Sequence, residues 1–212
     1  MKRRDNTMNH TTQYGLLIKR DQELRRALLP PKRSPTGNYK QSTYERVQGY
    51  KLLFHAELEY YFEEITKSIM KNAKDKWDNS HEASPTLVSL MAYCTKSFSS
   101  IPEYVRDQHA VDDLTKRINC AYSEHFAYIK SKNHGIKEKN ILALLLPIGV
   151  EIGDIDNGLL IALNNFGADR GEIAHSTKAK LCATPDDAEA TVNNILQLLA
   201  PFDSKLMKDY HL

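Results

Sequence analysis

The sequence lacks any long hydrophobic run, and no apolar stretch approaches the roughly 18 residues of a membrane-spanning helix. Its basic start, residues 1–6, is not followed by an apolar stretch, so we expect no secretory signal peptide. The three cysteines (Cys94, Cys120 and Cys182) are widely spaced, without the spacing of metal ligands, which is typical of reduced thiols. We therefore expect a cytoplasmic protein that has no bound metal and does not contact a membrane.

Two further absences restrict the fold class. No stretch alternates polar and apolar residues over a useful length, and the chain has no glycine-rich phosphate loop, which argues against a parallel-sheet nucleotide-binding fold. Hydrophobic residues make up 41% and charged residues 26% of the 212 residues, as in ordinary globular proteins. Apolar residues recur every three or four positions instead, and this period predicts an all-α fold.

Proline, glycine and capping residues divide the helical pattern into segments. We expect helices near residues 16–29, 43–71, 86–97, 111–132, 138–148 and 155–166, a short helix opened by Asp169 and Arg170, and a last helix opened by Thr184-Pro185. Residues 77–85 are expected to be irregular, and Gly167 is expected to end the helix before it. We predict a basic N-terminal arm with a short helix and linker over residues 1–40, and a helical domain over residues 41–212.

The N-terminal arm is strongly basic. Residues 1–40 hold ten Lys and Arg residues against three acidic residues, although the whole chain has a formal net charge of only +2. A basic arm can add phosphate contacts to an RNA complex. An ordinary solvated tail explains the same composition equally well.

The residues with the clearest chemical potential are Arg170 and His175. Arginine offers a rigid fork of donors that suits phosphate, and histidine can both accept and donate a proton near neutral pH. Five residues along a helix separate two side chains by about 140° and about 7.5 Å of rise, so the pair can flank one phosphate only if Arg170 lies at a helix start. The residues alone also fit a surface arginine and an ordinary helix histidine, since such pairs arise easily by chance.

The segment from Arg170 to His175 resembles the Arg-x4-6-His motif of the HEPN superfamily. Three further segments resemble its RiboL-PSP branch: residues 56–64, residues 133–137 and residues 184–186. The resemblance covers about residues 43–208. It implies a HEPN-like helical bundle that forms a homodimer, with two Arg/His pairs in one cleft.

The resemblance also implies an activity. HEPN ribonucleases cut RNA without a metal or other cofactor, often as toxins or phage-defence effectors. By this resemblance Arg170 and His175 are catalytic, RNA is the substrate, and an antitoxin or sensor protein is a possible partner. RNA supplies its own nucleophile, the 2′-OH, so we expect a 2′,3′-cyclic phosphate product.

Several other residues are candidates for supporting roles: Glu59, Asp169 and His134 near the catalytic pair, and Lys178 and Lys180 on the RNA backbone. Each has a simpler explanation. Glu59 lies four residues after His55 and can form a helical i, i+4 pair with it. His134 fits a loop that follows a helix C-terminus, and exposed lysines usually bind nothing specific.

Two departures from the family pattern leave alternatives open. The residue after the motif arginine is commonly polar and here is Gly171, which favours a non-catalytic HEPN-like module that binds nucleic acid or protein. Thr177 stands where toxins silenced by nucleotidylation carry a tyrosine, so we do not expect that form of control. A third possibility is a helical interaction protein in which Arg170 and His175 make surface contacts only.

Overall fold

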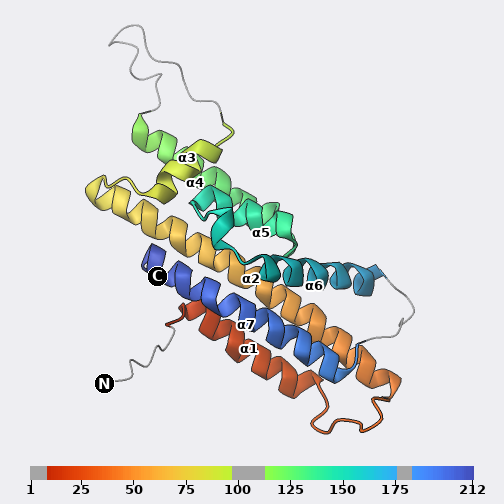
Figure 1. Cartoon of the computed structure of the whole chain (residues 1–212). Coiled ribbons are helices and arrows are strands. Elements are labelled where there is room, and N and C mark those ends of the chain that lie inside the picture. Colours follow the sequence, from red (N-terminus) through yellow and green to blue (C-terminus); the bar gives the residue numbers. More distant parts are fainter. Residues whose placement is uncertain (1–8, 97–112, 176–182) are drawn as a thin grey trace, which may run out of the picture.

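The computed structural model describes residues 9–96, 113–175 and 183–212, and of residues 169–175 it describes the helical backbone (Figure 1). The described residues contain helices and no strand, which confirms the all-α prediction. The helices are α1 (Thr12–Leu28), α2 (Gln41–Ser80), α3 (Pro85–Tyr93), α4 (Leu114–Ser131), α5 (Glu138–Leu145), α6 (Asn157–His175) and α7 (Pro185–Tyr210). Two short 3-10 turns, η2 (Leu146–Ile148) and η3 (Ile152–Asp154), lie between α5 and α6.

The 40-residue helix α2 is the element against which most of the others pack. Its buried side chains follow the helical period: Val47, Tyr50, Phe54, Leu58, Tyr61, Phe62, Ile65 and Ile69. Ala73 and Trp77 continue this buried face, so the helix extends to Ser80. The prediction of an irregular segment from Trp77 was therefore wrong, because the apolar repeat outlasts the polar residues around it.

Helices α1 and α7 lie along α2 (Figure 1). The fully buried carboxylate of Asp203, on α7, accepts hydrogen bonds from the Thr11 backbone N–H at 2.9 Å, the Thr11 hydroxyl at 2.5 Å and the Tyr61 hydroxyl at 2.8 Å. These bonds tie the start of α1 to α2 and α7. The short helix expected within residues 1–40 is present, and its apolar face belongs to the same core as the helices that follow.

Local capping explains where the last helix begins. The Thr184 hydroxyl accepts the Asp187 N–H at 3.2 Å, and the Asp187 carboxylate accepts the Thr184 N–H at 3.0 Å. This reciprocal pair is a capping box, with Pro185 in the first turn where its missing N–H costs nothing. The predicted start of α7 is confirmed.

Helix α6 differs from the prediction. We expected Gly167 to end one helix and Arg170 to open another, but a single helix runs through both positions to His175. Gly167 serves close packing instead: a Cβ atom there would lie 3.1 Å from Lys137 Cγ and 3.5 Å from Ile136 Cγ1. The glycine lets α6 approach the loop that precedes α5.

Candidate functional site

Five polar side chains on α2 repeat every four residues and form one side of the candidate site. These residues, here called the polar ladder, are Lys51, His55, Glu59, Glu63 and Lys67. Side chains four residues apart are neighbours on a helix, but each step turns by about 40°, so the row winds around α2 by about 160° from Lys51 to Lys67. Lys51 and His55 meet α6, and Glu59 and Glu63 meet the 133–137 loop, so the ladder joins segments that are far apart in the sequence.

Glu59 is the central contact of the ladder. Its carboxylate accepts the Gly135 backbone N–H at 2.8 Å, and its other oxygen lies 3.9 Å from His55 Nδ1. Gly135 has a φ of 122°, a backbone conformation that other residues rarely adopt, so the turn requires glycine at this position. Glu59 therefore holds the 133–137 loop on α2, and the predicted i, i+4 proximity to His55 is also present.

Glu63 makes a second contact with the loop. Asn133, which is buried, lies 3.5 Å through its side-chain N–H from the Glu63 carboxylate, and Lys67 approaches Glu63 to 3.6 Å. Burial raises the pKa of the Glu63 carboxyl, although Asn133 and Lys67 act in the opposite direction. The two glutamates thus fix the start of the loop by hydrogen bonds from Gly135 and Asn133.

The other end of the ladder packs on α6. His55 is 3% exposed and its ring stacks on Phe166 at 6.3 Å between centroids, while Lys51 Nζ lies 5.8 Å from the Phe166 ring centroid. The next residue, Gly167, is where α6 touches the loop. α2, α6 and the 133–137 loop therefore meet at one corner.

The last two turns of α6 extend from this corner and carry the predicted catalytic residues. Leu163, Phe166 and Gly167 form the buried face of the described part of α6. His175 is about 140° around the helix from Arg170 and about 7.5 Å further along its axis. The side chains of Asp169, Arg170 and His175 lie outside the described residues, so their roles stay predictions.

The other predicted residues divide between the loop and the segment after α6. His134 is exposed beside Gly135, in the loop that Glu59 holds. Lys178 and Lys180 lie outside the described residues. The described residues contain no group of three or more His, Cys, Asp or Glu side chains placed to hold a metal ion.

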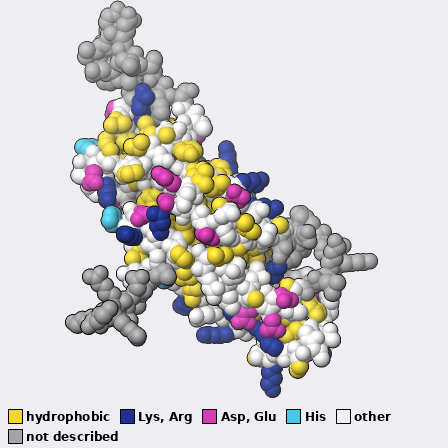
Figure 2. All heavy atoms as spheres, in the orientation of Figure 1, with side chains coloured by type: hydrophobic (Ala, Val, Ile, Leu, Met, Phe, Trp, Pro, Cys, Tyr) yellow, Lys and Arg dark blue, Asp and Glu magenta, His cyan; other side chains and the backbone are white. Residues whose placement is uncertain are grey.

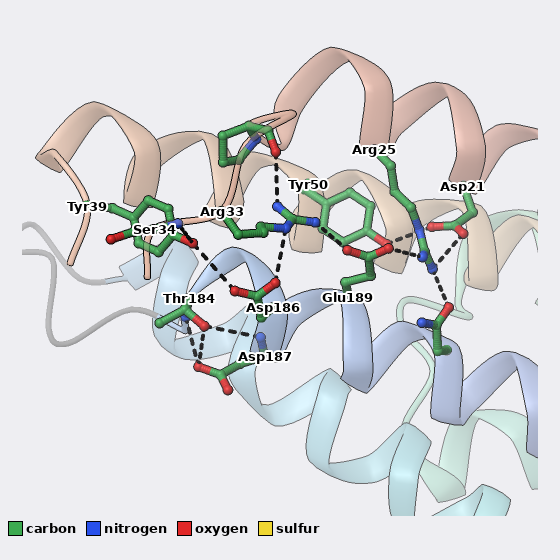
Figure 3. A network of polar contacts seen from close by, with 12 residues as sticks. Asp21, Arg25, Arg33, Ser34, Tyr39, Tyr50, Thr184, Asp186, Asp187 and Glu189 are labelled. Carbon is green, nitrogen blue, oxygen red and sulfur yellow. Dashed lines mark hydrogen bonds and ion pairs between the residues drawn. The ribbon is translucent and has the colours of Figure 1, made fainter. Parts of the chain in front are cut away.

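Two arginines of the N-terminal arm, Arg25 and Arg33, contact carboxylates (Figure 3). Arg25 pairs with Asp21 and with Glu189 of α7, each at 2.8 Å. Arg33 pairs with Glu189 and lies 3.0 Å from Asp186, in the first turn of α7. We expected phosphate contact or solvation for this arm. In the described part, these two arginines instead anchor α1 and the linker to the start of α7.

A family model for the RiboL-PSP-HEPN domain matches residues 16–208 of the chain. The chain belongs to the RiboL-PSP-HEPN family. This confirms the resemblance and the HEPN-like helical fold, and the match begins inside α1 rather than near residue 43. HEPN domains are often nucleases or nucleotide-binding proteins, and they often bind RNA and dimerise. No curated protein and no solved structure matches the chain.

Sequence reasoning missed two residues where α2 meets α6, Lys51 and His55. His55 entered only as a possible neighbour of Glu59, although the four-residue spacing of the whole ladder is visible in the sequence. The Gly135 N–H could not be found this way, because it is a backbone donor 76 residues from its acceptor.

No helix in the described part of the chain is long and apolar enough to cross a bilayer.

Proposed function

We propose that this HEPN protein is a metal-independent endoribonuclease in which Arg170 and His175 carry the chemistry. The observation that supports this most is the family match, which spans both residues and every segment of the corner. The motif occupies the last turns of α6, and Gly167 of the same helix touches the 133–137 loop that Glu59 holds. In this proposal the packed helical core holds the helix that carries the guanidinium and the imidazole.

The reaction needs one proton removed and one proton supplied. The RNA 2′-OH attacks the adjacent phosphorus, the bond to the 5′-oxygen breaks, and a 2′,3′-cyclic phosphate forms. His175 is the base toward the 2′-OH or the acid toward the 5′-oxygen. Arg170 stabilises the charge that develops on the phosphoryl oxygens.

The continuity of α6 bears on how that charge is stabilised. Helix N–H groups bind anions only in the first turn, where they lack partners within the helix. Arg170 lies thirteen residues after the start of α6, so backbone donors at this position are used within the helix. In this proposal the guanidinium therefore supplies the charge stabilisation without help from a helix N-terminus.

A single histidine does not easily serve as acid and base in the same step, and a second copy of the chain resolves this. We propose that the copies dock through an exposed apolar face of α2 that lies next to α1. Leu53 and Tyr60, seven residues apart on this face, are 44% and 54% exposed, and Leu16 of α1 is 51% exposed. Such a cluster of large apolar side chains is typical of an interface.

The dimer proposal is tested by molar mass. We expect the wild-type protein to have twice the chain mass of 24.2 kDa by light scattering, and Leu53→Asp and Tyr60→Asp to have the monomer mass. Val88→Asp is the matched control, because Val88 is 64% exposed on α3, away from this face. A dimeric Leu53→Asp/Tyr60→Asp double variant would exclude this interface.

Purified protein tested on mixed RNA and on DNA of the same sequence, with excess EDTA, tests the activity. We expect cleavage of RNA only, with cyclic phosphate ends, and loss of cleavage in Arg170→Ala and His175→Ala. Loss of cleavage by EDTA in the wild-type protein would refute the metal-free mechanism. RNA binding without cleavage by wild type would support the non-catalytic module that Gly171 favours.

A role as a toxin or phage-defence effector follows from the proposed activity. A ribonuclease that acts on cellular RNA must be restrained, which an antitoxin or a sensor protein can do. We expect induced wild-type protein to arrest growth with fragmentation of total RNA. Equal expression of His175→Ala should permit normal growth.

A further inference from the structure

A cavity of about 380 Å³, partly open to solvent, lies between α3, α4, α5 and η2. Its walls are mainly apolar and include Leu90, Tyr93, Ala121, Tyr128, Leu142 and Ala143. It shares no residue with the polar ladder or the 133–137 loop. On the face of the molecule in Figure 2, hydrophobic side chains gather over this α3–α4 end.

Two polar side chains of the cavity, Glu124 and His125, have hydrogen-bond partners within the protein. The Glu124 carboxylate accepts hydrogen bonds from the Cys94 thiol at 3.0 Å, the Thr95 N–H at 3.1 Å and the Thr95 hydroxyl. His125 Nε2 lies 3.1 Å from the Leu144 carbonyl oxygen, to which it can only donate. These bonds fix the end of α3 and the orientation of the imidazole, so the walls are set before any ligand enters.

Water is a poor occupant of this space. A water is held firmly where it makes two to four hydrogen bonds, and the mainly apolar walls offer few partners for them. Displacing weakly held water by an apolar group increases affinity. The cavity should therefore favour an apolar molecule over solvent.

The charges around the cavity disfavour ions. Burial lowers the pKa of His125, so the imidazole is neutral at physiological pH. Burial and the Glu124 hydrogen bond raise the pKa of the Cys94 thiol to about 11, so the thiol is neither charged nor a ready nucleophile. Glu124 is the charged side chain at the site and repels anions.

The size of the cavity limits the ligand further. A dry cavity of about 150 Å³ takes one benzene ring, and small-molecule sites usually span about 300–1,000 Å³. A volume of about 380 Å³ is thus suited to a molecule of two rings and is too small for a helix of a partner protein. The stacked rings of His125 and Tyr128, 6.0 Å apart at an interplanar angle of 4°, add an aromatic wall.

We propose that the α3–α4–α5 cavity binds a small, uncharged, aromatic molecule. This site is separate from the proposed RNA site, and its ligand is neither a nucleotide nor a phosphate. The proposal stands or falls independently of the ribonuclease activity.

The test uses indole as the probe and indole-3-acetate as its charged counterpart. In NMR spectra of the full chain with labelled alanine methyl groups, we expect indole to shift Ala121 and Ala143 and to give intermolecular contacts with both. Indole-3-acetate should bind at least tenfold more weakly, because its carboxylate meets Glu124. Ala143→Phe should weaken indole binding at least tenfold, whereas Ala27→Phe, at an exposed position on α1, should not.

The wild-type spectra decide the outcome even if Ala143→Phe does not fold. The absence of contacts from indole to Ala121 and Ala143 at its solubility limit would overturn the proposal. Binding of indole-3-acetate or adenosine monophosphate as tight as that of indole would also overturn it.

Discussion

Removal of the Glu59 side chain should release the 133–137 loop without unfolding the protein. A hydrogen bond to a charged group contributes about 1.5–3 kcal/mol. The Glu59 side chain is 21% exposed, so we expect the lower end, about 1.5 kcal/mol, for the bond from the Gly135 N–H. Because about 1.4 kcal/mol corresponds to a factor of ten, amide exchange at Gly135 should be roughly tenfold faster in Glu59→Ala.

Hydrogen exchange followed residue by residue measures this effect. Glu59→Gln keeps an acceptor oxygen and should recover part of the protection, since a neutral bond still contributes about 1 kcal/mol. Glu57→Ala is the matched control on the same helix, because Glu57 pairs with Arg20 and does not touch the loop. Unchanged exchange at Gly135 in Glu59→Ala would refute the view that this carboxylate holds the loop.

Three further predictions concern other parts of the chain. Asp203→Asn should lower the free energy of unfolding, measured by urea titration, by about 3 kcal/mol, because the buried Thr11 and Tyr61 donors lose their charged acceptor. A loss no larger than that of the exposed Asp209→Asn would contradict this. Gly167→Ala should stabilise the protein by up to about 1 kcal/mol through helix propensity if Lys137 shifts slightly. Gly167→Leu should destabilise it by about 1–3 kcal/mol, because the larger side chain meets Ile136. Equal effects of the two substitutions would exclude the packing role of Gly167. In a protein with Cys120 and Cys182 replaced by serine, Cys94 should react with iodoacetamide at pH 8 about one hundredfold more slowly than an unfolded cysteine. The reason is that the pKa of the Cys94 thiol is raised to about 11, and equal rates would contradict that shift.

Most of the helices could be predicted from the sequence because their signals are local. The apolar repeat of α2 and the Thr184-Pro185 start of α7 both depend on residues within a few turns of one another. The continuity of α6 through Gly167 could not be predicted in this way. The reason for that glycine is the approach of Lys137, thirty residues earlier, and nothing near position 167 indicates it.

The candidate site shows the same limit. Glu59 was identified from the resemblance, but its partner is the backbone N–H of Gly135, which no side-chain pattern reveals. The anchoring of the basic arm was also missed. Arg25 and Arg33 meet Glu189 only because α7 returns alongside α1, more than 150 residues later in the chain.

The central claim is that the RNA 2′-OH is the nucleophile and that His175 transfers its proton. The most direct measurement compares an RNA oligonucleotide that the protein cuts with the same oligonucleotide carrying one 2′-deoxy nucleotide on the 5′ side of the cut bond. With EDTA present, we predict that wild-type protein cuts the first and not the second at that bond, and that His175→Ala cuts neither. Cleavage of the deoxy-substituted bond, or full activity of His175→Ala, would contradict the proposed mechanism.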